Sequence, residues 1–230
     1  MKFYYNRNVN RKLIYCYETA RSMYRFDGKK WMGPIFLFNY FSMPTLAMDG
    51  KTILLTGTDG SIYQTHFTDT GWVNPRKFLN RSYPLYNLMP TETGRYYLGS
   101  YGTWGELSGN NGWRFSVLAG TGSDTSIQSL GEPLNNPGTF NGDFCIAPDE
   151  SYMIISAKET ATFECELFIS FKKAHQGWTV PVSLGALIND GLAHRWGPYV
   201  SPDEKCLFYT RGTSEKDCAI YWVRFDNLLK

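Results

Sequence analysis

The chain repeats one pattern of hydrophobic and polar positions, in which two alternating apolar runs flank a short polar turn. The clearest copy is residues 144–156, where apolar residues alternate on either side of Pro148, Asp149 and Glu150. Proline fixes its own φ, and an Asp carboxylate can accept hydrogen bonds from the next backbone N–H groups, so the chain is expected to reverse there. The stretch therefore predicts a strand, a tight turn and a second strand.

This strand–turn–strand pattern returns four more times with decreasing clarity. The other copies are residues 199–210, 44–56, 87–98 and 3–17. Asp203 and Asp49 occupy the place of Asp149 in two of them. We expect each Asp to cap its turn, because single carboxylates that are spaced along the chain do not supply the converging oxygens of a calcium site. Copies that span nearly the whole chain make an internal repeat.

Short strands and tryptophans fill the intervals between these copies. Trp31, Trp72 and Trp113 recur at equal spacing, and Trp178 follows after a longer interval that contains a small-residue insertion at 118–127. A unit of about 40–50 residues with about four short strands is typical of a β-propeller. Helical periodicity is not sustained anywhere. The tryptophans are expected to pack between outer strands, with a sugar-stacking platform as the alternative.

We therefore predict an all-β, single-domain β-propeller with about five four-stranded blades around a central channel, six being the less favoured count. A sheet of this kind cannot cover its own faces, so neighbouring blades stack on one another. The last unit lacks one strand, and the N-terminal FYYN could complete it or open the first blade. The predicted blade limits within the single domain 1–230 are approximately 1–38, 39–80, 81–135, 136–189 and 190–230.

Composition and charge remove several function classes. Aromatic residues make up 17% of the chain, which suits pleated surfaces. The net charge is only +2 and the Lys and Arg residues are scattered, so no nucleic-acid partner is expected. No apolar run is long enough to insert into a membrane, and we expect a monomer. The N-terminus lacks the features of a secretory leader, which favours the cytoplasm, or the periplasm or cell exterior if a leader was removed.

Cysteine and motif content argue against bound metals and cofactors. The five cysteines include no C-x-x-C pair and no Cys/His constellation of the kind that binds zinc. No P-loop or dinucleotide fingerprint is present either. We expect free thiols, no metal and no cofactor.

From residue 144 onwards the segments APDESYMIIS, ELFISF, GWTVPVSLGALIN, VSPDEKCLFYT and AIYWV follow one another. In this order they resemble the repeat of the WD-repeat-like propeller family, marked by a Pro-Asp-Gly box, that includes TolB and many bacterial proteins of unassigned role. Residues 37–80 match moderately, and 81–135 and 1–36 match loosely. Met48 replaces the box proline, Glu150 and Glu204 replace the turn glycine, and Ala219 replaces the usual Asp. The resemblance implies a non-catalytic propeller that binds a protein, peptide or glycan.

In that family the segments just ahead of each box start the innermost strand near one mouth of the channel. Here these segments are rich in aromatic and polar residues, which suit a small-molecule or peptide pocket. A polar channel filled with water is the alternative interpretation. The predicted binding residues are Tyr40, Tyr86, Asn87, Asn141, Asp143, His194, Arg195 and Trp196.

Candidates for catalysis are few, and the sequence leans against an enzyme. No Gly-x-Ser-x-Gly elbow or His-Glu-x-x-His motif occurs. If the chain is an enzyme, the predicted catalytic residues are Asp143, His194 and Asp190. His194 could form an acid/base pair with Asp143, and Asp143 with Asp190 could be the carboxylate pair of a glycosidase, with Glu132 a weaker candidate. A small carbohydrate-active hydrolase or lyase is therefore the alternative to a binding scaffold.

Overall fold

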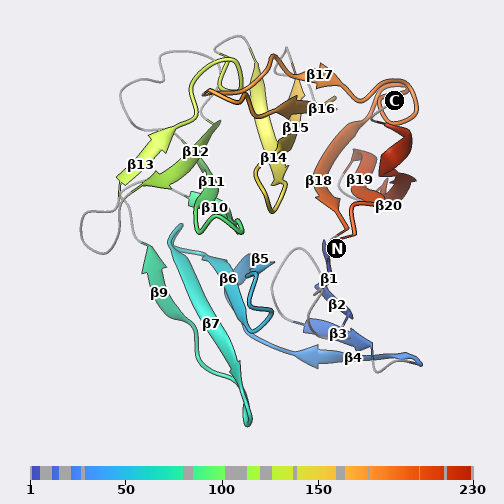
Figure 1. The fold of residues 1–230 in the computed structure, drawn as a ribbon. Coiled ribbons are helices and arrows are strands. Elements are labelled where there is room, and N and C mark those ends of the chain that lie inside the picture. Colours follow the sequence, from blue (N-terminus) through green and yellow to red (C-terminus); the bar gives the residue numbers. More distant parts are fainter. Residues whose placement is uncertain are drawn as a thin grey trace. The chain divides into compact units, whose positions relative to one another are not determined.

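The structure is a computed structural model. It describes residues 2–5, 12–15, 22–26, 29–79, 85–101, 113–119, 126–136, 139–158, 164–175, 177–201, 203–214 and 217–228. The chain divides into two compact units, Met1–Pro90 and Thr91–Lys230, and each is described by itself. The described strands form five sheets, in which strands that follow one another along the chain lie side by side (Figure 1).

The first unit holds two complete sheets and one further strand. Its first sheet consists of β1 (Lys2–Tyr5), β2 (Lys12–Tyr15), β3 (Ser22–Phe26) and β4 (Trp31–Phe36). Its second consists of β5 (Phe41–Leu46), β6 (Thr52–Gly57), β7 (Ile62–Thr68) and β8 (Gly71–Trp72), with β9 (Arg76–Leu79) also paired to β7. Strand β10 (Leu85–Pro90) ends the unit and begins the third sheet, whose order is β10-β11-β12-β13.

The second unit contains the strands from β11 onwards. The third sheet continues through β11 (Tyr96–Tyr101), β12 (Trp113–Ala119) and β13 (Ser126–Ser129). The fourth consists of β14 (Phe140–Ile146), β15 (Tyr152–Lys158), β16 (Glu166–Phe171) and β17 (Val182–Ser183). The fifth consists of β18 (His194–Val200), β19 (Cys206–Ser214) and β20 (Asp217–Arg224), followed by the short helix η2 (Phe225–Asn227).

The structure answers one question that the sequence left open. Strand β1 pairs antiparallel with β2, with Phe3 opposite Ile14, so the N-terminal strand opens the first sheet. The fifth sheet has three strands among the described residues, one fewer than the first, third and fourth. The prediction that the last unit lacks a strand is confirmed for this part of the chain.

The turns between paired strands follow the predicted chemistry. Asp49 Oδ1 accepts the N–H groups of Lys51 and Thr52 at 2.8 Å each, and Asp149 Oδ1 accepts that of Ser151 at 2.9 Å. These carboxylates therefore cap their turns, as expected. The turn position after each of them requires a positive φ, which glycine adopts most easily. Glu150 occupies it with φ 66°, where the second sheet has Gly50 with φ 65°.

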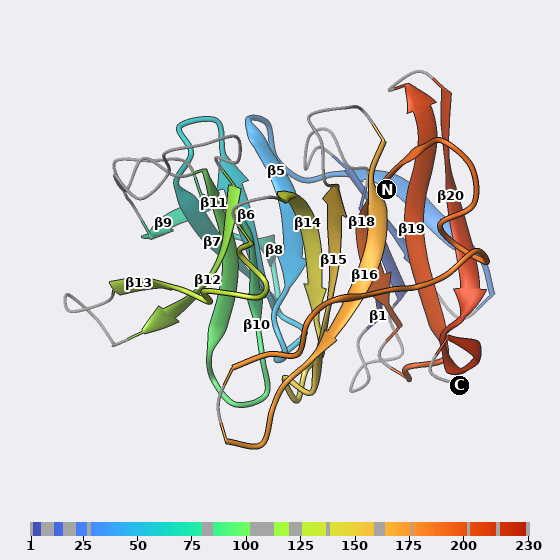
Figure 2. The same ribbon diagram turned by 90° about the horizontal axis from the view of Figure 1, so that it is seen from above.

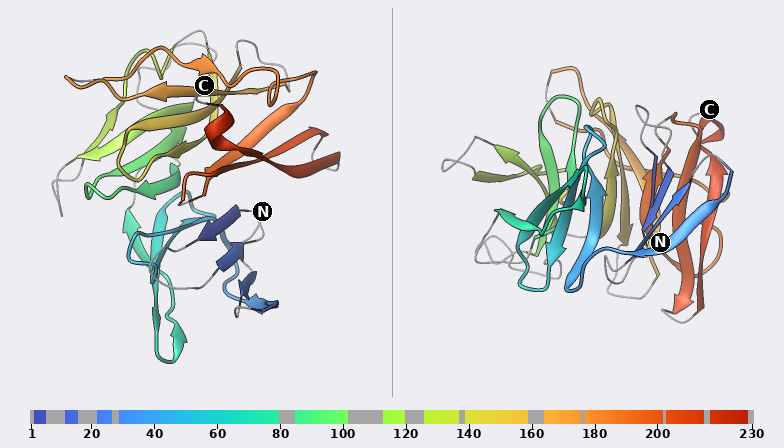
Figure 3. Two further views of the ribbon diagram at one scale, coloured as in Figure 1. Left: turned by 45° about the vertical axis from the view of Figure 1, so that its right-hand side comes forward. Right: turned by 90° about the horizontal axis from the view of Figure 1, so that it is seen from below.

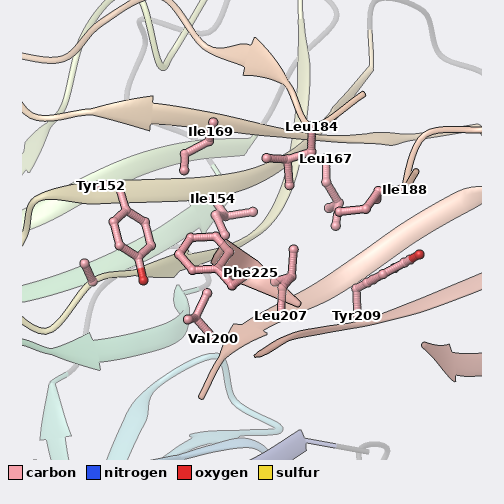
Figure 4. Packing of buried hydrophobic residues seen from close by; sticks show 11 residues of the cluster. Tyr152, Ile154, Leu167, Ile169, Leu184, Ile188, Val200, Leu207, Tyr209 and Phe225 are labelled. Carbon is pink, nitrogen blue, oxygen red and sulfur yellow. The ribbon is translucent and has the colours of Figure 1, made fainter. Parts of the chain in front are cut away.

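The core of the second unit lies between the fourth and fifth sheets of the chain. These two sheets lie next to each other in Figures 2 and 3. Leu167 on β16 and Leu207 on β19 are fully buried in the same cluster (Figure 4). Burial of apolar surface contributes roughly 25 cal/mol per Å², so each sheet is stabilised by covering its neighbour. The cluster consists of Ala147, Tyr152, Ile154, Leu167, Ile169, Leu184, Ile188, Val200, Leu207, Tyr209 and Phe225.

The prediction of an all-β chain is confirmed, since strands dominate the described residues and helix is almost absent. In the part of the chain that the structure describes, no helix has the length and hydropathy needed to cross a membrane.

Candidate functional site at the first strands of the sheets

The first strand of several sheets carries a bulge at the same place ahead of the turn. The pairing register shifts between Ser42 and Thr45 on β5, between Asn141 and Phe144 on β14, and between Trp196 and Tyr199 on β18. Bulges of this kind redirect side chains and are frequent near functional sites. In the first unit the equivalent positions are Met43 and Asn87, with φ 46° and 53°; in the second they are Asp143 and Gly197, the latter with φ 59°.

In the second unit the two bulges are joined by a hydrogen bond. The backbone N–H of Gly197 on β18 donates to Oδ2 of Asp143 on β14 at 2.9 Å. Asp143 is only 9% exposed. No ion pair to Asp143 occurs among the described residues. A carboxylate has about four acceptor sites, so the hydrogen bond from Gly197 uses only part of the acceptor capacity of Asp143.

His194 and Trp196 precede Gly197 on the same strand. They are two residues apart on β18, and their ring centroids are 5.0 Å apart at an interplanar angle of 52°. Both side chains are partly buried. Three of the predicted site residues, Asp143, His194 and Trp196, are thus carried by the first strands of two successive sheets in one unit. An aromatic pair on one strand and a carboxylate on the first strand of the next sheet are groups that suit binding of a peptide or a sugar.

Arg195, between these two aromatic residues, is buried and donates its hydrogen bonds to backbone carbonyls. Its side chain is 1% exposed. The Nε–H donates to the carbonyl of Ile188 at 2.7 Å, and the two terminal nitrogens donate to the carbonyls of Cys165, Ala193, Asp190 and Gly191. Burial lowers the pKa of Arg195, and repulsion from Arg211 adds to this effect. The sequence placed Arg195 among ligand-facing residues, whereas its donors hold the backbone ahead of β18.

Asn141 occupies the position on β14 that Arg195 occupies on β18. It is 4% exposed, and its Nδ2 donates to the carbonyl of Leu134 and to Oδ1 of Asn135, both at 3.3 Å. Leu134 stands where Ile188 stands in the next sheet. Both residues therefore tie a first strand to the loop that precedes it, and this use of Asn141 also differs from the predicted ligand contact.

The remaining predicted binding residues belong to the first unit. Tyr40 precedes β5, is 75% exposed and has φ 68°. Tyr86 and Asn87 lie on β10 and are 5% and 0% exposed, respectively. Tyr40 is accessible to a ligand in this unit, whereas Tyr86 and Asn87 are enclosed by protein.

The predicted catalytic carboxylates have separate partners. Asp190 precedes β18, and its Oδ1 lies 3.2 Å from Nη1 of Arg211 and 3.9 Å from Nη2 of Arg195. Its carboxylate is therefore engaged by guanidinium groups, while that of Asp143 accepts a backbone N–H. Glu132 is exposed in the loop after β13. In the described ranges, no group of three or more His, Cys, Asp or Glu residues could hold a metal ion.

Glu150 forms a polar cluster that the sequence did not indicate. It is 0% exposed and accepts hydrogen bonds from Tyr97 at 2.8 Å and Thr91 at 3.0 Å, and also from Thr93 and Lys172. Burial raises the pKa of Glu150, but hydrogen bonds from Lys172, Thr93, Tyr97 and Thr91 outweigh it and bring the pKa to about 2. Nη1 of Arg95 also lies 3.3 Å from Oε2 of Glu150. The cluster therefore fastens the β14–β15 turn to β11 and to the turn ahead of it.

A second missed feature was visible in the sequence. Residues 129–135, SLGEPLN, and 183–189, SLGALIN, share a Ser-Leu-Gly-x-x-Leu/Ile-Asn pattern. Asn189 Oδ1 accepts the N–H of Leu167 at 2.9 Å and its Nδ2 donates to the carbonyl of Leu167 at 2.8 Å. Asn135 makes the same two bonds with Phe115, each at 2.8 Å. These asparagine clamps position the loops to which Asn141 and Arg195 bind.

No family model matches the chain, and no curated protein matches it. Solved structures do. A crystal structure of TolB from Acinetobacter baumannii is 14% identical with a TM-score of 0.58, and the match covers 99% of this chain and 52% of that chain. The chain thus spans about half the length of that TolB.

Two further structures give comparable matches. Prolyl oligopeptidase B from Galerina marginata, bound to a 35mer hydrolysis and macrocyclization substrate, is 12% identical with a TM-score of 0.53. That match covers 98% of this chain and 32% of the other. Kuenenia stuttgartiensis hydrazine synthase is 11% identical with a TM-score of 0.52, over 99% of this chain and 77% of the other. At these identities the likeness concerns the fold, and the chain has the all-β, propeller-like fold that it shares with TolB.

Proposed function

We propose that the chain is a non-catalytic propeller that binds a protein, peptide or glycan at the first strands of its sheets. The observation that carries this proposal is the grouping of Asp143, His194 and Trp196 on β14 and β18. Asp143 has acceptor capacity beyond its bond to Gly197, and the aromatic pair offers apolar surface on β18, the strand that carries Gly197. Together these groups can accept a hydrogen bond from a ligand and stack against an apolar or sugar face.

We also propose that the repeats belong to the TolB-like family with a Pro-Asp-Gly box, and that each sheet is one blade of a single domain with the limits predicted from the sequence. Support comes from the turns, where Asp49, Asp149 and Asp203 cap the backbone as box aspartates. Glu150 and Glu204 adopt the positive φ of the family's turn glycine. We further propose that the chain is a monomer when it binds its protein partner.

A glycan array and a peptide library, screened with the purified chain and a Trp196→Ala variant, test the function. Loss of the aromatic surface should weaken binding of a ligand at this site at least tenfold, since an aromatic contact residue often contributes about 1–3 kcal/mol or more. Trp222→Ala is the matched control, because Trp222 is an exposed tryptophan on β20, away from the first strand. Asp143→Asn keeps the shape of the carboxylate and should weaken binding of ligands that donate to it.

The outcomes separate the alternatives. A ligand whose affinity is unchanged by Trp196→Ala and by Asp143→Asn contradicts the placement of the site. Turnover of a bound glycan that is abolished by Asp143→Asn would replace the binding function with the carbohydrate-active hydrolase or lyase. A ligand lost with Trp222→Ala but retained with Trp196→Ala binds a different surface.

A further inference from the structure

The third strand of a sheet is covered at its outer edge by the segment that follows it, and this covering is repeated in detail. In the fourth sheet, Asn189 bonds both backbone groups of Leu167 on β16, and β17 pairs with the same strand through Val182 opposite Ile169. In the third sheet, Asn135 bonds both backbone groups of Phe115 on β12. The backbone N–H and C=O at this position therefore point outwards in both sheets.

The supporting details of the two clamps also coincide. Ser183 Oγ accepts the N–H of Gly185 and the side-chain amide of Asn189, at 3.2 and 2.9 Å. Ser129 Oγ does the same for Gly131 and Asn135, at 3.1 and 2.8 Å. The apolar residue before each asparagine is buried. One short sequence pattern thus produces the same covering on two different strands.

The equivalent position in the fifth sheet is Ile220 on β20. Leu167 pairs with Ser156, and Ile220 pairs with Thr210, which stands at the same place after its turn glutamate as Ser156 does. By this register the N–H and C=O of Ile220 point away from β19. Among the described residues, no strand pairs with the outer edge of β20 and no asparagine clamps it. In Figures 2 and 3 this strand lies at the edge of its sheet.

Side chains are buried on the covered third strands and more exposed on β20. Leu167 and Ile169 on β16 are 0% and 5% exposed, and Phe115 is 0% exposed. Trp222, which stands at the register position of Ile169, is 61% exposed, and Ile220 is partly exposed. In the fourth sheet the covering segment contributes Leu184 and Ile188 to the cluster that contains Leu167 and Ile169. An equivalent segment on β20 would place its apolar residues against Ile220 and Trp222.

We propose that the outer edge of β20 docks an extended segment of a partner protein, with an asparagine that clamps the backbone of Ile220. This site is independent of the one at β14 and β18. The chemistry of the occupant follows from the two segments that perform this covering within the chain: a Ser-Leu-Gly turn, an apolar residue, and a side-chain amide that accepts one backbone hydrogen bond and donates another. Strand addition to an open sheet edge combines main-chain pairing with such side-chain contacts.

A fluorescent peptide with the sequence of residues 182–190, VSLGALIND, provides the probe. Titrated against the full chain, it should bind, and the same peptide with Asn189→Ala should bind about tenfold more weakly, because two hydrogen bonds are lost. Hydrogen exchange of the free and peptide-bound chain gives the location. The amides of Ile220 and Trp222 should slow on binding, whereas those of Ala219 and Tyr221, which point towards β19, should change little.

An Ile220→Pro variant removes the outward N–H and should abolish binding, while Trp196→Ala should leave it unchanged. If the proline variant does not fold, as judged by circular dichroism, the exchange measurement on the native chain still locates the site. No binding at roughly 1 mM peptide, equal affinity for both peptides, or protection away from β20 would overturn the proposal. A dimer of the native chain that protects the same amides would assign the edge to a second copy instead, and would equally overturn it.

Discussion

Glu150 occupies a turn position where the repeat otherwise has glycine, and its side chain explains why the substitution is tolerated. A non-glycine residue at positive φ costs of order 1 kcal/mol. At φ 66° the carboxylate of Glu150 reaches Thr91, Tyr97 and Lys172, which belong to other strands and turns. Glu204 has φ 54° at the equivalent turn, and from the described residues its side chain accepts one hydrogen bond, from Tyr152 at 3.4 Å. The two glutamates therefore share a backbone conformation and differ in their environment.

We predict that Glu150→Gln lowers the free energy of unfolding by about 2–3 kcal/mol at neutral pH. The pKa of Glu150 is lowered from 4.5 to about 2, so the charged form stabilises the fold above the unfolded-state pKa. This contribution is lost as pH falls from about 4.5 towards 2. Urea unfolding of both proteins across this window should show the difference between them shrinking as the pH is lowered.

Glu204→Gln is the matched control for Glu150→Gln, because it changes the same kind of turn and leaves the backbone strain unaltered. Its effect should stay within about 0.5 kcal/mol at neutral pH, since Glu204 is itself exposed and the hydrogen bond that it accepts from Tyr152 is long. Equal losses in the two variants would show that the stabilisation comes from the turn and not from the cluster of donors around Glu150.

The two outer loops that carry the asparagine clamps, residues 129–135 and 183–189, have the same structure and make the same contacts. Each loop begins with a Ser-Leu-Gly turn, in which Gly131 and Gly185 have φ 65° and 76°. The asparagine at the end of each loop then bonds the third strand of the sheet, at Phe115 on β12 or Leu167 on β16. The next first strand is bound in turn, since Arg195 donates to the carbonyl of Ile188 and Asn141 to that of Leu134. The loop thus connects the outer edge of one sheet with the first strand of the next.

Asn189→Ala is expected to lower the free energy of unfolding by about 1–3 kcal/mol, because it removes both partly buried hydrogen bonds to the backbone of Leu167, which is itself 0% exposed. Chemical denaturation measures this loss. Asn135→Ala should lose a similar amount, since its bonds to Phe115 are the same. Leu187→Ala, in the same loop but 62% exposed, should change little. A loss from Leu187→Ala as large as that from Asn189→Ala would contradict the role given to the clamp.

Hydrogen bonds between residues that are close in the sequence could be predicted from it, whereas those between distant segments could not. Capping by Asp49 and Asp149 involves N–H groups two or three positions away, so the pattern of the turn was sufficient. The partners of Glu150 lie more than fifty positions back on the third sheet, apart from Lys172, and no local pattern identifies them. The contacts of Arg195 were not predicted either, because its acceptors are carbonyls of Cys165 and of the loop ahead of β18. The repeated SLG-x-x-Leu/Ile-Asn segments were available in the sequence and would have identified both clamps.

At the scale of the whole molecule, stability depends on each sheet being covered by the next. In the second unit, Leu167 and Ile188 from the fourth sheet and its loop meet Leu207 and Tyr209 of the fifth. The hydrogen bonds within a sheet do not supply this burial, so neither sheet is expected to be stable without the other. The repeat pattern predicted such stacking, but it could not identify the residues that meet across it.

Leu207→Ala tests this dependence, because Leu207 is 0% exposed within the shared cluster. The variant should lose about 2–5 kcal/mol of unfolding free energy through lost burial and the cavity left behind. If the sheets unfold together, hydrogen exchange should accelerate on β14–β16 as well as on β18–β20, although the substitution touches only β19. Val182→Ala, on β17 and 61% exposed, should leave both sheets protected. Faster exchange confined to the fifth sheet would mean that the fourth is stable by itself, and that covering by the next sheet contributes less than the cluster suggests.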